Sequence, residues 1–501
     1  MPASPSQLSK HRGAVAMSNA IAFSTACLLL LLTVLSRLAR STAWLVLAAH
    51  NIPWVIALTV WSSGVIMYNA SPTSSAMILV GGVLSFNLGV LVNREQNRAV
   101  TSVRRCYYTA AVSLRAYSLL WVAYILGFLW LLLTISRYFG LGTLLTNPKS
   151  IRSYSDVNYL QVFPLPGKLL FYLAPLLMVL TANSRLVLQL RGSPRLFRAS
   201  LFLVLVVSQF ASLQRTNIFI GIVWSVAVAM IERAGKQAVT TEASSNAPRV
   251  ARKRLAQRNS VVAAVGILGA IICFQFIGNT LGKTAGHDSR FSPYLSKSIN
   301  WEPAASILIY GSSGVAAFLT LTQSPNHSWP GNLKPPIFGD YNPVTHGAAT
   351  FAFAPKIAPL FTAWPEVGPF VSVPFPTNVY TWLEPWYRDF RVPGVTMVPF
   401  AVGFLITSLV RRRESSLNSQ LLAALALTVL VWAPFTNRLM STMTIELALV
   451  VAYVLRPRRI EAPGALLPTD FLRAVHGGNA GSRAEFRVEQ ATLELAGTAD
   501  R

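Results

Sequence analysis

Long apolar stretches recur along almost the whole chain, and they restrict the fold more than any other feature of the sequence. A helix needs about 20 apolar residues to cross the hydrocarbon core of a bilayer, within a range of about 17–25. About eleven segments approach that length, near residues 19–36, 43–67, 74–92, 113–136, 168–189, 198–213, 217–231, 260–280, 396–410, 417–435 and 439–455. Because a lipid-exposed backbone must satisfy its own hydrogen bonds, these segments are expected to be helices. The sequence predicts an all-α, polytopic transmembrane helical bundle.

Charged residues make up only 12% of the 501-residue chain, whereas hydrophobic residues make up 53%. Ordinary soluble domains carry about 25% charged residues, so the composition is typical of a multi-pass membrane protein. The three cysteines, Cys27, Cys106 and Cys273, lie in or near apolar segments. Their odd number and their spacing predict neither a disulfide framework nor a metal site.

Residues 281–395 interrupt the apolar pattern and are rich in Pro, Trp and Tyr. Loops longer than about 12–15 residues are usually functional or disordered, and a disordered segment would contain few aromatic residues. We therefore expect this loop to carry the active site of a membrane enzyme. It divides the chain into N-terminal membrane spans at 1–280, the loop at 281–395, C-terminal spans at 396–455 and a flexible cytoplasmic tail at 456–501.

The net charge of +25 is distributed unevenly along the chain. The loop is almost neutral, with seven Lys or Arg against six Asp or Glu, so nucleic acid is not an expected partner. Cytoplasmic connections of membrane proteins are enriched in Lys and Arg. Alternating spans place the long loop outside the cytoplasm and every basic connection inside it, at residues 94–105, 191–198, 249–258, 411–413 and 456–459.

The N-terminus does not fit this alternation, since Lys10 and Arg12 would then lie outside. The first apolar segment could instead be a signal-like sequence, although Arg40 beside the possible cleavage region argues against it. Within the loop, residues 301–321 are long enough to cross the membrane. Crossing would move residues 411–413 to the outer face, so we expect a re-entrant or membrane-surface helix there.

The turn between segments 198–213 and 217–231 contains Arg215, which the alternation places at the outer boundary of the membrane. Thr216 or Asn217 can cap the following helix, whose N-terminal amides point outward. An arginine beside a helix N-terminus is suited to binding phosphate. The alternative is an interfacial arginine that extends to water and binds no ligand.

Lys283 and Arg290 lie at the start of the long loop. The sequence from Gly278 to Thr284 resembles a nucleotide-binding loop, but only three residues separate its glycines where GxxxxGK[ST] requires four. A nucleotide site is therefore not expected. The two cations suit a lipid-linked diphosphate as point charges, or they are ordinary interfacial cations.

Three charged residues, Glu384, Arg388 and Asp389, lie close together near the end of the loop. The aromatic residues among them are Tyr380, Trp382, Trp386 and Tyr387. Aromatic side chains bind sugar rings, but they also gather at membrane interfaces. Because Arg388 and Asp389 are neighbours in sequence, they cannot face each other on a helix, and we expect each to have its own partner.

Other ionisable residues give weaker indications. Glu446 lies well inside the last predicted span, with Arg438 at that span's outer end. An acid within the membrane is a functional candidate, and pairing with another helix is the structural alternative. The loop contains three histidines, His287, His327 and His346, and their spacing does not match a metal-binding motif.

Several of these segments together resemble the bacterial oligosaccharide repeat-unit polymerases of the Wzy type, also called O-antigen polymerases. The resemblance depends on YGSSGVAAFLTL at 310–321, PTNVYTWLEPWYRDFRVPGVTMVPFAVGFL at 376–405, the span at 74–94 and QRTNIFIG at 214–221. In that family a glycine follows the Asp-Phe pair, whereas here Asp389-Phe390 is followed by Arg391, and Gly394 comes later. The likeness extends loosely from about residue 51 to 455.

The resemblance implies a glycosyltransferase that uses lipid-linked donors on the outer face of the bacterial cytoplasmic membrane. Its substrates would be polyprenyl-diphosphate-linked oligosaccharides, its surroundings membrane lipids, and it would need no cofactor. Arg215, followed by Arg290 and Arg388, would stabilise the departing diphosphate, and Asp389, or else Glu384, would act as the base. Family members commonly work beside a chain-length regulator and a flippase.

Three other functions remain open from the sequence. A lipid-linked glycan flippase or other transporter would typically place ionisable residues at mid-membrane, and here Glu446 is the one such residue. A ligase that transfers finished glycan to another acceptor would share the architecture. A purely structural membrane scaffold is the remaining alternative.

Overall fold

A computed structural model describes most of the membrane domain. The described residues are 5–39, 41, 43–68, 71–95, 111–147, 163–183, 186–187, 190, 193–211, 215–243, 302–323, 349–354, 371–373, 375–414 and 416–455. All of them belong to one compact unit, Met1–Arg458. Lys283, Arg290, the loop histidines and the predicted span at 260–280 lie outside the described residues.

Helices form nearly all the regular structure of the described residues. Those of the N-terminal half are α1 (Pro5–Leu38), α2 (Ala43–Ser62), α3 (Thr73–Glu95), α4 (Leu114–Phe139), α5 (Leu141–Thr146), α8 (Leu165–Phe171), α9 (Ala174–Ala182), α10 (Arg195–Phe210) and α11 (Arg215–Ala243). The remainder are α13 (Glu302–Gln323), α15 (Glu384–Arg411), η5 (Arg412–Glu414), α16 (Leu417–Val431), α17 (Thr442–Leu449) and η6 (Val450–Val454). Two residues each of β1 (Val371–Ser372) and β2 (Pro376–Thr377) pair as an antiparallel ladder.

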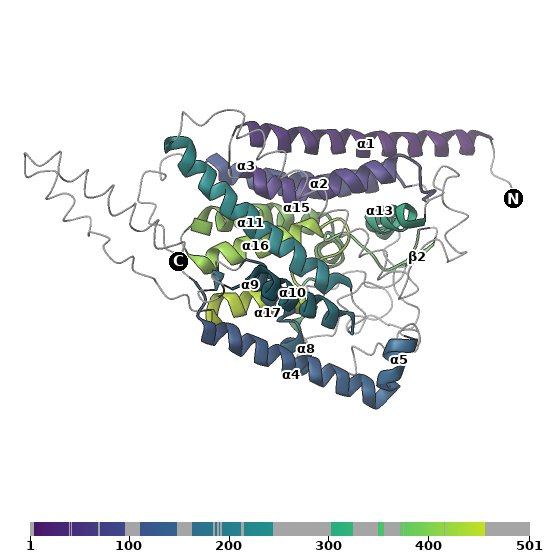
Figure 1. The fold of residues 1–501 in the computed structure, drawn as a ribbon. Helices are drawn as coiled ribbons and strands as arrows, with labels where there is room; N and C mark the ends of the chain where they lie inside the picture. The colour runs from purple at the N-terminus through teal and green to yellow at the C-terminus, as the bar shows by residue number, and fades with distance from the viewer. Residues whose placement is uncertain are drawn as a thin grey trace, which may run out of the picture. The chain divides into compact units, whose positions relative to one another are not determined.

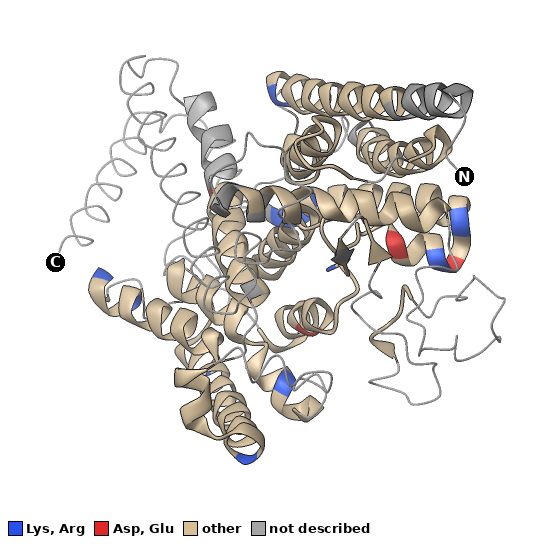
Figure 2. Ribbon diagram, turned by 90° about the vertical axis from the view of Figure 1, so that its right-hand side faces the viewer, with Lys and Arg blue, Asp and Glu red and all other residues tan. Residues whose placement is uncertain are grey.

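The all-α prediction is confirmed. Six helices of the described region are long and apolar enough to cross a membrane, at Ala16–Leu38, Ala43–Ser62, Thr73–Asn93, Leu114–Phe139, Leu165–Ala182 and Glu384–Arg411. Shorter apolar helices cover Thr216–Glu232, Leu417–Val431 and Thr442–Val454. Charged residues are sparse along these helices and lie mainly near their ends (Figure 2). These features indicate a multi-pass membrane protein, while the expected total of about eleven spans stays a prediction.

Helices α3 and α15 pack closely and in parallel. A Cβ atom on Gly89 would lie 2.0 Å from the carbonyl oxygen of Phe400, and one on Gly403 would lie 2.3 Å from that of Phe86. The backbones therefore approach each other at small residues, as is common between membrane helices. At the C-terminal ends, the Asn93 amide donates to the carbonyl of Phe404 and accepts from Nη1 of Arg411, each at 2.6 Å.

A buried polar network joins α1, α2 and α3. The Asn51 amide donates to Oδ1 of Asn87 at 2.8 Å and to Oγ1 of Thr33 at 3.1 Å. Its own Oδ1 lies 2.9 Å from Nδ1 of His50. These bonds satisfy the Asn51 amide, which would otherwise be costly to bury between apolar helices, whereas Nε2 of His50 has no hydrogen-bond partner among the described residues.

Helix α13 lies across the ends of other helices. Its mid-helix Ser312 shares a 2.7 Å hydrogen bond with Tyr68, in the loop that follows α2. Its Phe318 packs on Tyr387 of the first turns of α15, with ring centroids 5.8 Å apart. In Figure 1, α13 is seen along its axis, whereas α1 and α4 are seen lengthwise. The five consecutive residues from Val315 to Leu319 are all buried, so this part of α13 is enclosed on every side.

Candidate functional site

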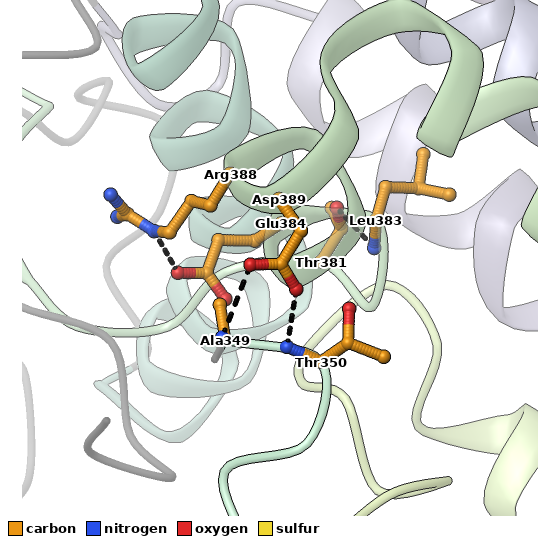
Figure 3. A network of polar contacts seen from close by, with 7 residues as sticks. All are labelled: Ala349, Thr350, Thr381, Leu383, Glu384, Arg388 and Asp389. Atoms are coloured by element: carbon orange, nitrogen blue, oxygen red, sulfur yellow. Dashed lines mark hydrogen bonds and ion pairs between the residues drawn. The ribbon is translucent and has the colours of Figure 1, made fainter. Parts of the chain in front are cut away.

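The first two turns of α15 carry a buried charged cluster (Figure 3). Glu384 and Arg388 are one helical turn apart and form a hydrogen-bonded ion pair through Oε1 and Nε. Asp389 accepts hydrogen bonds from the backbone N–H of Ala349 at 3.2 Å and of Thr350 at 2.7 Å. Arg388 and Asp389 therefore have separate partners, as the sequence predicts.

Local sequence sets the start of this helix. The Oγ1 atom of Thr381 accepts from the backbone N–H of Leu383 at 3.3 Å. Pro385 stands in the first turn of α15, where a missing N–H has no helical partner to lose. The ion pair then follows from the spacing of four residues, which brings two side chains onto one helix face. Arg388 is 2% exposed and Asp389 is 1% exposed, so both charges depend on these partners.

The four aromatic residues around the cluster are packed inside the protein. Tyr380, Trp382, Trp386 and Tyr387 are all buried. The guanidinium of Arg388 lies over the Tyr380 ring, 5.5 Å from its centroid. Burial raises the pKa of the Tyr380 hydroxyl well above its ordinary value, so this group stays neutral and can donate a hydrogen bond.

Trp382 and Trp386 connect the cluster to the transmembrane helices. Their rings are 4.8 Å apart between centroids, and Trp382 also lies 5.4 Å from both His50 of α2 and Phe86 of α3. In this arrangement neighbouring side chains cover the rings. The assignment of these four aromatic residues to substrate binding remains a prediction.

Helix α15 is interrupted directly after the charged cluster. Arg391 has φ 56° and ψ −141°, and it separates the turns that carry the cluster from the long apolar part of the helix. Only glycine adopts such a conformation at little cost.

A second group of polar residues surrounds the start of α11. Arg215 is the first residue of that helix, and its side chain lies outside what the structure describes. Nη2 of Arg438 lies 3.5 Å from Oγ1 of Thr216, which places a second arginine at this helix end. Below this helix end, a chain of hydrogen bonds joins α11, α10 and α4. The Asn217 amide donates to Oε1 of Gln209 at 3.2 Å, and the Gln209 amide donates to the hydroxyl of Tyr124 at 3.1 Å.

The turn that follows α16 brings the two groups to the same end of the bundle. The carbonyl of Ala433 accepts from the backbone N–H of Trp382 at 2.8 Å. Next to it, the ring of Trp432 meets Phe219 of α11, with centroids 6.4 Å apart. Five residues after Ala433, Arg438 reaches Thr216. The segment from Trp432 to Arg438 therefore contacts Trp382, which lies beside the α15 cluster, and it also contacts α11, the helix that begins at Arg215.

Glu446 lies in α17 and is partly buried, and no hydrogen-bond partner within the described residues meets its Oε2. Helix η6, a π-helix, begins four residues later. The described part of the chain contains no group of three or more His, Cys, Asp and Glu that could hold a metal ion.

Several contributors to the site were not identified from sequence. Ala349 and Thr350 act through their backbone amides, which leave no signature in a sequence. His50, in contrast, is an ionisable residue inside an apolar segment, and that signal could have identified it. The positive φ of Arg391 has no signal in the sequence of this chain alone, because the residue there is not glycine.

Comparison with known proteins adds no relative. No protein-family model, curated protein or solved structure matches this chain.

Proposed function

We propose that this protein is a membrane glycosyltransferase that polymerises polyprenyl-diphosphate-linked oligosaccharide repeat units into a surface polysaccharide, as the Wzy-type resemblance implies. The observation that carries the proposal is the meeting of two polar groups at one end of the bundle. Trp382, which lies two residues before the α15 cluster, and the first turns of α11 both contact the segment from Trp432 to Arg438. Such an arrangement suits a lipid-borne substrate at the membrane surface.

Helix directions support an outer location for this end in the bacterial cytoplasmic membrane. Helices α3 and α15 run in parallel, so Asn93 and Arg411 meet at the opposite end. The basic residues 411–413 belong to that opposite end, which the distribution of Lys and Arg assigns to the cytoplasm. Helix α13 would then be a re-entrant or surface helix at the outer face, as the sequence predicts.

The proposed reaction requires a base and cationic groups from the protein. An acceptor hydroxyl oxygen attacks the anomeric carbon of the growing glycan, its proton passes to a carboxylate, and the bond between that carbon and the diphosphate oxygen breaks. The polyprenyl diphosphate leaves with the bonding electron pair. Arginines stabilise that developing charge through charge-assisted hydrogen bonds. We assign this task to Arg215, with Arg388 and Arg290 as further candidates.

Between the two candidate bases, the geometry favours Glu384. Both oxygens of Asp389 already accept backbone N–H groups, whereas Glu384 is paired through its Oε1 atom. The Glu384 side chain is 10% exposed, and the same helix turn carries Arg388. Asp389 then acts as a positioning residue that holds the segment at 349–350 against α15.

Rival functions are separated by the lipid-linked intermediates that accumulate when the gene is deleted. Loss of a polymerase leaves single repeat units on the outer face of the membrane. Loss of a flippase traps lipid-linked units inside, and loss of a ligase leaves long chains on the carrier lipid. Either of the last two patterns would overturn the proposal.

Replacement of the candidate catalytic arginine gives a sharper test. Arg215→Ala is expected to lower chain extension by about 100-fold or more, because a charge-stabilising donor is lost where the leaving group departs. Gel profiles of surface polysaccharide in the complemented deletion strain measure the effect. Arg195→Ala is the matched control, since Arg195 is also the first residue of a helix, α10, and is exposed. Polymer of wild-type length in the Arg215→Ala strain would remove Arg215 from the site.

A further inference from the structure

Glu446 is an acidic residue without a counter-ion in an apolar helix. It is the one charged residue of the stretch from Thr442 to Val454, which comprises α17 and η6. Its Oε2 atom is buried and has no hydrogen-bond partner among the described residues. No ion pair or other electrostatic contact joins its side chain to another described residue. A negative charge on this carboxyl group would therefore be uncompensated within the described part of the chain.

The neighbouring elements supply no cation. Helix α16 packs against α17 and contains no ionisable residue. Along the chain, Arg438 precedes α17 and contacts Thr216 of α11, and Tyr453 follows in η6 and is exposed. A carboxylate that is removed from water and has no cation beside it is so costly that the group takes up a proton instead.

The outward side of Glu446 faces lipid. Glu446 itself is partly exposed, and it shares a helix face with Leu449 and Tyr453, which are 51% and 72% exposed. Apolar residues that are exposed on a membrane helix face the bilayer. The stretch Thr442–Val454 is about 20 Å long at 1.5 Å per residue, whereas the hydrocarbon core is about 30 Å thick. Glu446, one turn from the N-terminal end, therefore lies in the hydrocarbon rather than in water.

The backbone beside Glu446 departs from the α-helix. The N–H of Val450, the first residue of the π-helix η6, donates to the carbonyl of Glu446. At the other end of η6 the Leu455 N–H donates to the carbonyl of Val450 at 3.0 Å, five residues back. Such π-helical turns are rare, and they occur frequently at functional sites. The π-helix is a second indication, independent of charge, that Glu446 lies at a functional position.

We propose that Glu446 is a proton-binding site inside the membrane, which holds its proton at neutral pH and is accessible from the bilayer. Its ligand is a hydrogen ion, and release of that ion would leave a negative charge in the hydrocarbon. The proposal does not rest on the polymerase activity, because that reaction is assigned to Glu384, Asp389 and the arginines.

A lipid-soluble carbodiimide detects such a group, because it reacts with neutral carboxylic acids. The carboxyl oxygen bonds to the central carbon of the reagent, the O–H bond breaks, and the proton passes to one reagent nitrogen as its double bond to carbon becomes single. The acyl group then moves from oxygen to nitrogen and gives a stable N-acylurea. No atom is lost, so the peptide gains the mass of one reagent molecule.

Labelling of the full chain in phosphatidylcholine vesicles with dicyclohexylcarbodiimide tests the proposal at about pH 8. A glutamate in water has a pKa of about 4.3 and is ionised there. Peptide mass spectrometry is expected to find one reagent molecule on Glu446 and none at this position in Glu446→Gln. Glu384 is the internal control, because its carboxylate is paired with Arg388, and it is expected to stay unlabelled.

Thermal unfolding at about pH 8 gives a second measurement that needs no reagent. If Glu446 is neutral, Glu446→Gln replaces one neutral side chain by another of nearly the same shape, and the melting temperature is expected to stay unchanged. If Glu446 were ionised, the same substitution would remove an uncompensated buried charge and raise the melting temperature. Glu384→Gln is the matched control, and it is expected to melt lower because it breaks a buried ion pair.

Three results would overturn the proposal. The first is the absence of label on Glu446 at about pH 8, including label that appears at about pH 5 and is lost at the higher pH. The second is equal labelling of Glu446 and Glu384, which would show that the reagent does not distinguish a neutral acid in lipid from a paired carboxylate. The third is a higher melting temperature of Glu446→Gln than of the wild-type protein.

Discussion

Glu384 and Asp389 lie in the same two helical turns but have opposite surroundings. Glu384 pairs with a cation on its own helix, whereas Asp389 accepts from the backbone of a segment about forty residues earlier in the chain. Both amides would lose a hydrogen-bond acceptor if the Asp389 carboxylate were removed, and an unsatisfied buried N–H is costly. Asp389 is therefore the residue through which α15 holds the segment 349–354 in place.

Asp389→Asn tests this role. The amide nitrogen that replaces one oxygen cannot accept from Ala349 or Thr350, so one buried N–H is expected to lose its partner at a cost of about 1–3 kcal/mol. Hydrogen exchange of the 349–354 backbone, followed by mass spectrometry, is expected to accelerate. Glu232→Gln on α11 is the control, because no described contact joins it to this segment. Unchanged exchange in Asp389→Asn would show that other contacts hold the segment.

At the level of elements, the pairing of α3 with α15 is the closest helix contact described. It depends on glycines whose hydrogen atoms leave room for a neighbouring carbonyl. A larger residue would push apart two backbones rather than rotate a side chain. Packing of this kind is sensitive to a single methyl group.

Gly89→Ala is expected to destabilise the protein by about 1–3 kcal/mol, because the added methyl group would overlap the Phe400 carbonyl. Gly81→Ala is the matched control on the same helix, where an added Cβ meets no atom within 4 Å. The control gains helix propensity and should be neutral or slightly stabilising. Thermal unfolding of both variants in detergent measures the difference, and equal melting temperatures would contradict the packing described.

The helices could be predicted from the length of the apolar segments. Their pairing could not, because the residues in contact are far apart in the sequence. The segments at 43–67 and 113–136 correspond to α2 and α4 because their apolar composition alone requires a helix in lipid. The contact of Asn93 with Phe404 spans 311 residues, and no local pattern encodes it. The charged residues of the site were visible in sequence for the same reason as the helices, since ionisable groups stand out in an apolar chain. The pairing of Glu384 with Arg388 follows from their spacing of four residues, whereas the backbone amides that bind Asp389 could be identified only from the structure.

At the scale of the whole membrane domain, the proposed function depends on which helix ends face outward. Tyr68, Trp382 and the start of α11 belong to one end, and Asn93 and Arg411 belong to the other. Burial inside the bundle protects most of these residues from reagents. Exposed residues near each end are therefore the useful probes.

Cysteine labelling in intact cells tests the orientation. In a chain whose native cysteines are replaced by serine, Ser63→Cys is expected to react with a membrane-impermeant maleimide, because Ser63 is exposed just beyond α2. Arg412→Cys, exposed at the other end of α15, is expected to react only after permeabilisation. The reverse pattern would place the charged cluster in the cytoplasm and exclude synthesis on the outer face.

The long separation between α3 and its partner also constrains how the protein is made. At about 5–20 residues per second, the ribosome would take roughly 15–60 s to add the residues between Asn93 and Phe404. During that interval α3 sits in the bilayer with its glycine face open and the Asn93 amide lacking its later acceptor. A chain that terminates before α15 never closes this face, so premature products should be recognised and degraded by membrane quality control.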